Sequence, residues 1–286
     1  MKPLVLDFDG SVKPLPNELR IDFRDSQEKI RFGCRLDALR VLGKLNSSDA
    51  LVSQPAITFL GSGDFHHLSH WLISRYVRLE QEIQVVVFDN HPDNMRYPFG
   101  IHCGSWVWHV SRLPFVSCVH VVGITSTDVE AAHGWENHLR NLRSGKVRYW
   151  CVGRDLGWMR HFGIQHSQSF ATTNHMLAAF QAHLAVLPAP TYLSIDKDVL
   201  SIADAHTNWD QGVMRLSELE TAIAQLRHRL IGCDVTGDIS VYSYQSRCKR
   251  FLSGIDGQPE IGEADLERWQ IEQQAINLNL LQCLAG

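Results

Sequence analysis

The chain alternates between short runs of β-branched and aliphatic residues and longer stretches with helical periodicity. The predicted strands are Pro3–Phe8, Ala56–Leu60, Ile83–Phe88, Val116–Val122, Val147–Val152, Thr191–Ile195 and Leu230–Val235. The predicted helices are Leu36–Leu45, His67–Glu82, Val129–Arg143, Thr172–Leu187, Leu216–Arg229 and Ala264–Leu284. This alternation favours an α/β fold, in which helices cover both faces of a parallel sheet.

Nothing in the 286 residues divides the chain, because it has no internal repeat, low-complexity tract or long Pro/Gly/Ser linker. We therefore expect a single domain over residues 1–286 that ends in a helix at about 264–284. An apolar stripe on that helix, from Leu266 to Leu284, predicts packing against the sheet or against another subunit. A homo-oligomer is thus an open alternative.

The charge balance excludes some classes of partner. Lys and Arg number 27 and Asp and Glu 31, so the net charge of −4 indicates neither nucleic-acid nor anionic-membrane binding. No apolar run reaches the ~18 residues of a membrane span, and Asp7 and Asp9 interrupt any secretory signal. The odd number of cysteines, seven, without a CxxC pair, favours free thiols. We expect a cytoplasmic protein that acts on a small molecule.

Acidic and histidine side chains gather in three segments: Gly63-Asp64-Phe65-His66-His67, Asp89-Asn90-His91-Pro92-Asp93 and Asp196-Lys197-Asp198. The second and third come directly after predicted strands. Residues two apart in an extended chain point to the same side, so Asp89, His91 and Asp93 could converge, as could Asp196 and Asp198. Ligands of open parallel sheets bind outside the carboxyl ends of the strands, which predicts a site there.

Carboxylates combined with imidazole indicate a metal site. This ligand set suits Mn²⁺, Fe²⁺ or Zn²⁺ better than Ca²⁺. With a bridging carboxylate, such as Asp89 or Asp196, it could hold two cations that activate a water. Each segment alone has a plainer interpretation, since Asp and Asn also cap helices and form turns. Their joint occurrence at strand ends favours metal.

In order and composition these segments resemble the signature motifs of the arginase/agmatinase ureohydrolase superfamily, GGDHS, DAHxD and SxDxDxxDP. The segment Phe99–Gly104 resembles the histidine-glycine segment that follows the second motif, and the resemblance covers roughly Ala56 to Asp238. It implies a three-layer α/β/α sandwich on a mainly parallel sheet of about eight strands. It also implies two divalent metal ions, with Mn²⁺ expected and Fe²⁺ or Zn²⁺ as alternatives.

The resemblance implies a role for each matching residue. The implied metal ligands are His66, Asp89, His91, Asp93, Asp196 and Asp198, with His67 as a rival to His66. His102 resembles the active-site histidine that is thought to shuttle protons, and an imidazole can titrate near the working pH. The implied reaction is hydrolysis of a C–N bond in a guanidino, amidino or amide compound by a hydroxide that bridges two metals.

Two departures affect the expected substrate. The third motif lacks its final Asp-Pro, because residues 196–203 read DKDVLSIA. Gly237 stands where arginases carry a glutamate that binds the guanidinium group, and Asp238 or Asp234 could substitute for it. We take Asp238 as the candidate. The missing glutamate also leaves a non-catalytic, metal-binding protein open, because a fold does not imply a function.

A second enzymatic interpretation comes from the N-terminus. Residues 6–11, LDFDGS, resemble the DxDG[TS] motif of haloacid-dehalogenase-type phosphatases, with Asp7 as nucleophile and Asp9 as general acid. Asp234 and Asp238 have the spacing of the Mg²⁺ motif of those enzymes. This alternative leaves the GDFHH and DNHPD segments unexplained, and an acidic turn closed by Gly10 accounts for the same residues.

Overall fold

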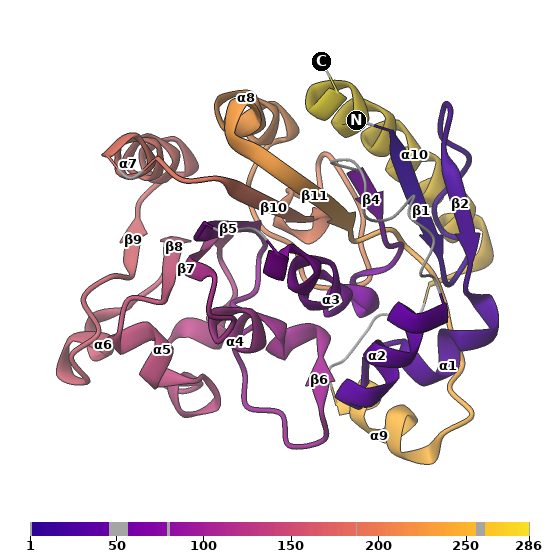
Figure 1. The fold of residues 1–286 in the computed structure, drawn as a ribbon, viewed down its shortest axis with the longest axis horizontal. Helices are drawn as coiled ribbons and strands as arrows, with labels where there is room; N and C mark the ends of the chain where they lie inside the picture. Colours follow the sequence, from indigo (N-terminus) through magenta and orange to yellow (C-terminus); the bar gives the residue numbers. More distant parts are fainter. Residues whose placement is uncertain (1, 46–56, 79–80, 187, 256–260, 286) are drawn as a thin grey trace.

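The computed structural model describes residues 2–45, 57–78, 81–186, 188–255 and 261–285. At its centre nine parallel strands form one sheet in the order β2-β1-β4-β11-β10-β5-β7-β8-β9 (Figure 1). The strands are β1 Pro3–Asp7, β2 Leu19–Asp22, β4 Ile57–Phe59, β5 Ile83–Phe88, β7 Val116–Ile124, β8 Val147–Val152, β9 Gln168–Phe170, β10 Thr191–Asp196 and β11 Leu230–Thr236. A separate antiparallel pair joins β3 (Gly33–Cys34) to β6 (Ile101–His102).

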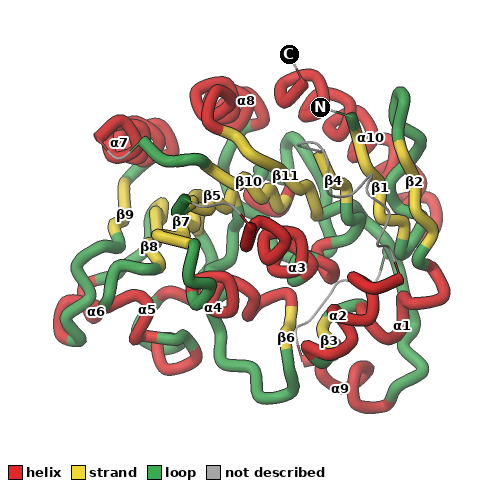
Figure 2. The backbone as a smooth tube through the Cα atoms, viewed as in Figure 1, coloured by secondary structure: helices red, strands yellow, loops and turns green. Residues whose placement is uncertain are grey.

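Helices cover both faces of the sheet, which confirms the predicted α/β sandwich (Figures 1 and 2). The helices are α1 Gln27–Ile30, α2 Leu36–Leu45, α3 Leu68–Ser74, α4 Trp106–Ser111, α5 Leu139–Arg143, α6 Gly157–His161, α7 Thr173–Val186, α8 Leu216–Leu226, α9 Arg247–Ile255 and α10 Glu263–Ala285. One core packs α2 to α6 on the sheet, and the other packs α7, α8 and α10 on the opposite face.

Alternate residues of each central strand supply the two cores. In β5, Val85 and Val87 belong to the first core, whereas Val86 and Phe88 belong to the second. This is the expected result for a nearly continuous apolar strand that is buried on both faces. The sequence-based prediction missed the edge strands β2 and β9, because they are largely exposed and have no apolar run.

Two predicted helices differ from the structure. The segment 129–143 forms 3₁₀ turns at Thr127–Val129 and Gly134–Glu136 before the short α5, so one long helix is wrong there. Gly134 packs so closely on Trp158 that a Cβ would collide with the indole. This contact explains why a glycine stands at this position, within a segment whose pattern otherwise resembles a helix. The predicted helix His67–Glu82 is divided into α3 and a 3₁₀ turn, Arg75–Arg78. Residues 79–80 of this prediction lie outside the described residues. The same holds for Ala56 of a predicted strand and Leu187 of a predicted helix.

The long C-terminal helix α10 occupies the stretch where a terminal helix was predicted. Its residues Ile276, Leu280 and Leu284 are buried in the second core, so the apolar stripe packs within the chain. Within the described ranges, no helix is both long and apolar enough to cross a membrane.

Candidate metal centre

The parallel sheet brings the three polar segments to one edge. β10 pairs with β5, and Ile195 lies opposite Phe88, so the residues that follow both strands are neighbours. β10 also pairs with β11, which pairs with β4, the strand that precedes the GDFHH segment. Because all these strands run in the same direction, their carboxyl ends point to a common site.

We had expected the extended geometry of β5 to continue into the site. Instead, the chain reaches the site through a turn after β5. β5 ends at Phe88, and the backbone amide of His91 donates to Oδ1 of Asp89 at 2.6 Å. Asp93 has a φ of +45°, a left-handed conformation that costs a non-glycine residue energy and often marks functional sites. The indole N–H of Trp106 donates to Asp93 Oδ2 at 2.6 Å and holds the carboxylate in place.

The Asp196-Lys197-Asp198 segment forms a turn, and its two carboxylates also lie beside histidines of the cluster. Asp196 ends β10 and accepts the backbone amide of Asp198 at 3.1 Å, which caps the 3₁₀ turn Lys197–Val199. Oδ1 of Asp198 accepts the amide of Asn90 at 3.0 Å, so this turn is joined to the turn after β5. Capping and clustering of carboxylates therefore coexist here.

The Nδ1 atom of His66 faces three carboxylates. Its distances to their nearest oxygens are 3.2 Å for Asp89, 3.0 Å for Asp93 and 3.3 Å for Asp196. All four side chains are buried. Such a convergence of one imidazole and three carboxylates is what a divalent-cation site requires.

A second group adjoins the first. Nδ1 of His91 lies 2.9 Å from Oδ2 of Asp198 and 3.7 Å from Oδ1 of Asp89. Candidate ligand atoms lie within 4.8 Å of one another in the group His66, Asp89 and Asp93, and likewise in the group Asp89, His91 and Asp198. Asp89 is common to both groups, so the structure brings all six predicted ligands together around two adjacent sites.

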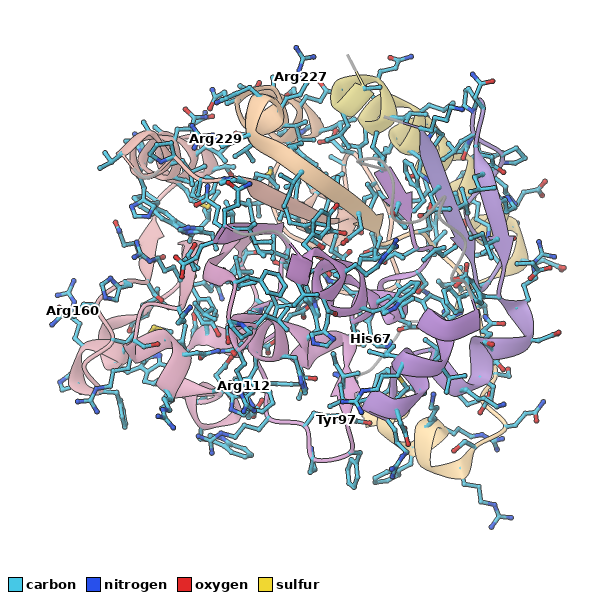
Figure 3. The ribbon with its side chains drawn as sticks, viewed as in Figure 1. His67, Tyr97, Arg112, Arg160, Arg227 and Arg229 are labelled. Atoms are coloured by element: carbon cyan, nitrogen blue, oxygen red, sulfur yellow. The ribbon has the colours of Figure 1, made fainter. Side chains whose placement is uncertain are left out.

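His67 does not face the carboxylates. Its ring is buried, and neither ring nitrogen has a hydrogen-bond partner among the described residues. Figure 3 labels this side chain, which lies directly before α3. Between the two adjacent histidines, the geometry therefore favours His66 as the ligand.

Burial and mutual repulsion oppose ionisation of the carboxylates of the cluster. Burial, and then the negative charge of Asp89, raise the pKa of both Asp93 and Asp198 to about 7. Burial and the charge of Asp198 raise the pKa of Asp196 well above its usual range. Oδ2 of Asp89 is buried, and its polar neighbour, Nδ1 of His66 at 3.2 Å, also faces Asp93 and Asp196. Divalent cations would neutralise these carboxylates, so the residues fit a pair of metal ions.

The cluster opens into a cavity of about 450 Å³. Besides the predicted ligands, its described lining includes Met95, His102, Cys103, Ser126, Asp128, His133, Glu136, Asn137, Trp209 and Asp210. None of the described lining residues is a lysine or arginine. Sequence reasoning missed Asp128 and Glu136, which follow the carboxyl end of β7, and also missed Trp209 and Asp210, which lie in a segment without a recognisable pattern.

His102 stands in the cavity wall, but its expected titration near the working pH is wrong. Its Nδ1 accepts the backbone amide of Gly104 at 2.9 Å, and Tyr97 stacks on the ring at 4.9 Å between centroids. Burial lowers the pKa of His102 to about 3, so the ring is neutral at neutral pH.

Asp238 does not fill the place of the missing glutamate. It is buried outside the described cavity lining, 2.9 Å from Nζ of Lys197, and it accepts a hydrogen bond from Asn277 at 2.8 Å. Its carboxylate is therefore already neutralised by a lysine of the metal-site segment, and the expectation that it binds substrate is wrong. Asp234 is likewise occupied, by the hydroxyls of Ser69, Ser194 and Tyr192.

The phosphatase alternative also lacks a site. Oδ2 of Asp7 lies 3.1 Å from Arg20 and 2.7 Å from Arg24, so the proposed nucleophile is held by two guanidinium groups. Asp9 accepts the hydroxyls of Ser11 and Ser240, both at 2.7 Å. Neither aspartate belongs to the described lining of the cavity.

Comparison with known proteins identifies the fold. No family model matches the sequence. An uncharacterized protein of Thermotoga maritima is 29% identical over 239 residues, which cover 82% of this chain and 78% of that protein. Among solved structures, the arginase of Bacillus caldovelox aligns with a TM-score of 0.53 at 11% identity, over 91% of this chain and all of that one.

Two further structures agree. The arginase of Bacillus cereus aligns with a TM-score of 0.51 at 14% identity, over 87% of this chain and 76% of that one. The formiminoglutamase of Trypanosoma cruzi with Mn²⁺ aligns with a TM-score of 0.51 at 12% identity, over 94% of this chain and 74% of that one. The chain therefore has the fold of the arginase/agmatinase superfamily, as its motifs predicted.

Proposed function

We propose that this protein is a metal-dependent hydrolase that cleaves a C–N bond in a guanidino, amidino or amide small molecule. The observation that carries the proposal is that Asp89 belongs to two adjacent groups of candidate metal ligands. His66 and Asp93 would hold one cation with it, and His91 and Asp198 the other. Asp196 lies close enough to His66 to serve as a second shared carboxylate. The similarity to a formiminoglutamase solved with Mn²⁺ supports Mn²⁺ as the cation.

Bound at this site, two divalent cations would lower the pKa of a water and stabilise negative charge in the transition state. The protein contributes the arrangement of its carboxylates and the exclusion of bulk water from the buried cluster. In this proposal His102 meets the substrate as a neutral imidazole, because it lines the cavity with a lowered pKa.

The charge of the cavity favours a cationic substrate. Asp128, Glu136 and Asp210 line it beyond the six candidate ligands, and its described lining contains no basic lysine or arginine. A guanidinium or amidinium group would be attracted by this excess of negative charge. A substrate that carries a carboxylate would find no cationic side chain in the described lining.

The test is hydrolysis by Mn²⁺-loaded protein of a panel that contains agmatine, arginine, 4-guanidinobutyrate, formiminoglutamate and simple amides. Release of urea, formamide or ammonia from at least one compound, lost in Asp89→Ala, is the expected result. Binding of two Mn²⁺ without turnover of any compound would favour the non-catalytic alternative. Phosphate release from a generic ester, lost in Asp7→Asn, would favour the phosphatase.

A further inference from the structure

In the two histidines of the candidate metal centre, the Nε2 atoms that point away from the carboxylate cluster have different hydrogen-bond partners. Nε2 of His66 lies 3.0 Å from the hydroxyl of Ser194. That hydroxyl donates to Asp234 at 2.7 Å, and Asp234 also accepts hydrogen bonds from Ser69 at 2.9 Å and Tyr192 at 2.7 Å. All of these groups are buried. The imidazole of His66 therefore contacts the neutral hydroxyl of Ser194, and the carboxylate of Asp234 is linked to it only through that hydroxyl.

His91 contacts a carboxylate directly. Its Nε2 lies 2.7 Å from Oδ1 of Asp210, while its Nδ1 faces Asp198 at 2.9 Å. The side chain of Asp210 is 69% exposed, but it is tied to the segment that carries His91. Nδ2 of Asn90 donates both to Oδ2 of Asp210, at 3.2 Å, and to its backbone carbonyl, at 3.0 Å.

The loop that carries Asp210 is anchored on the turn of the metal site. The amide of Gly212 donates to the carbonyl of Asp198 at 2.7 Å. The side chain of Gln211 donates to the carbonyls of Leu200 and Ala205, at 3.1 and 2.8 Å. A Cβ at Gly212 would collide with the carbonyl of Val199, so the loop approaches this turn as closely as a glycine permits.

We propose that Asp210 is a positioning residue of the metal centre. Its carboxylate accepts the Nε2–H of His91 and thereby directs the Nδ1 lone pair toward the cation that Asp89 and Asp198 would share. A histidine that ligates a metal generally donates its other N–H to such a partner, which selects the tautomer, orients the ring and makes it a stronger ligand. This inference deepens the proposed function, because it requires that the cluster binds metal.

The arrangement predicts that the two cation sites respond differently to loss of Asp210. The site of His91 loses its support, whereas the site of His66 keeps Ser194 and Asp234. Asp210→Ala should therefore weaken one of two Mn²⁺ sites by about 10- to 100-fold and leave the other unchanged. Asp210→Asn should cost less, because its amide oxygen can still accept the hydrogen bond from Nε2–H.

The experiment is calorimetric titration of metal-free protein with Mn²⁺, repeated with Co²⁺ so that the visible spectrum reports on coordination. Asp204→Asn is the matched control, because Asp204 lies on the same loop and is ion-paired with Arg215 at 2.7 Å, away from the cavity. Weakening of one site in Asp210→Ala, with an altered Co²⁺ spectrum and no change in Asp204→Asn, supports the proposal.

Four results would overturn it. Wild-type affinity at both sites of Asp210→Ala would show that the carboxylate does not act on the metal, while the proposed function stands. Equal weakening of both sites, or the same loss in Asp204→Asn, would indicate a general effect on the loop. A wild-type protein that binds no Mn²⁺ would overturn the proposed function and this inference with it.

Discussion

Nζ of Lys197 lies 2.9 Å from Oδ1 of Asp238, and both side chains are buried. Lys197 stands between two candidate metal ligands, and its ammonium also donates to Asn277 of α10 at 2.8 Å. The ion pair therefore joins the metal-site segment to the loop after β11 and to the C-terminal helix. Asp196 ends β10 and Asp198 lies in the 3₁₀ turn that follows, and both contact histidines of the cluster, whereas Lys197 between them contacts Asp238 and Asn277.

Asp238→Asn should destabilise the protein by about 3–5 kcal/mol, because it leaves the buried ammonium of Lys197 without a counter-ion. Urea unfolding measures the loss. Asp265→Asn is the control: Asp265 forms an exposed ion pair with Arg268 at 2.8 Å, which should contribute about 1 kcal/mol at most. A loss as small as that of the control would show that the buried pair is unimportant for stability.

Gly237→Ala should weaken Mn²⁺ binding as well as stability. Gly237 has a φ of +92°, and a Cβ there would lie 2.5 Å from Oδ1 of Asp196 and 2.7 Å from the amide of Lys197. Gly10→Ala is the matched control, since Gly10 has a φ of +70° with open space around it and so tests backbone strain alone. That strain costs about 1–2 kcal/mol. Equal losses of stability in the two variants, with Mn²⁺ affinity retained, would exclude the collision with Asp196.

Arginine should be a poor substrate. The collision at Gly237 excludes a glutamate from the position that the resemblance to arginases assigns to guanidinium binding, and Asp238 is engaged by Lys197. Loss of one charged hydrogen-bond partner costs about 1.5–3 kcal/mol, or roughly 10- to 100-fold in kcat/KM. Urea release measures this directly against the best substrate of the panel. Arginine hydrolysis as efficient as that of the best compound would contradict the expectation.

Bound Mn²⁺ should raise the thermal stability of the wild type, and Asp89→Ala should abolish the response. A ligand present at 100 times its Kd stabilises a protein by about 2.7 kcal/mol when it binds only the folded state. Thermal unfolding with Mn²⁺ and with chelator measures the effect, and Asp155→Ala, at an exposed aspartate, is the control. A melting temperature indifferent to both additives would contradict metal binding by this cluster.

His120 should make the protein sensitive to acid. Burial, and then His183 and Arg148, lower the pKa of His120 to about 3, and the indole N–H of Trp150 donates to its Nδ1 at 3.2 Å. The unfolded chain takes up this proton near pH 6.5. Between about pH 6.5 and 3 the unfolded state therefore binds a proton that the folded state does not, and stability falls as the pH is lowered.

His120→Gln should remove this contribution. The dependence of the unfolding free energy on pH should become shallower by up to about 1.4 kcal/mol per pH unit between pH 6 and 4. Urea unfolding at a series of pH values measures the slope. His175→Gln, at an exposed histidine, should leave it unchanged. An unaltered slope in His120→Gln would show that this histidine does not contribute to acid sensitivity.

The order of strands and helices and the chemistry of the strand ends could be predicted from the sequence because both are local properties. Apolar runs such as Ile83–Phe88 mark strands that are buried on both faces, and the acidic residues that follow them announce a site at the carboxyl edge. The same local reasoning failed for residues 129–143, where the contact of Gly134 with Trp158 overrides the helical pattern.

Local patterns along the chain were enough to predict the fold class and the six residues that meet in the cluster. The choice of His66 over His67, the pairing of Asp238 with Lys197 and the contact of Asp210 with His91 became evident only in the folded structure. These outcomes depend on contacts between segments far apart in the chain, such as the 119 residues that separate His91 from Asp210. Periodicity in the sequence indicates which face of a strand or helix is buried. The hydrogen-bond or ion-pair partner of a polar side chain depends on which loops the packed elements bring together.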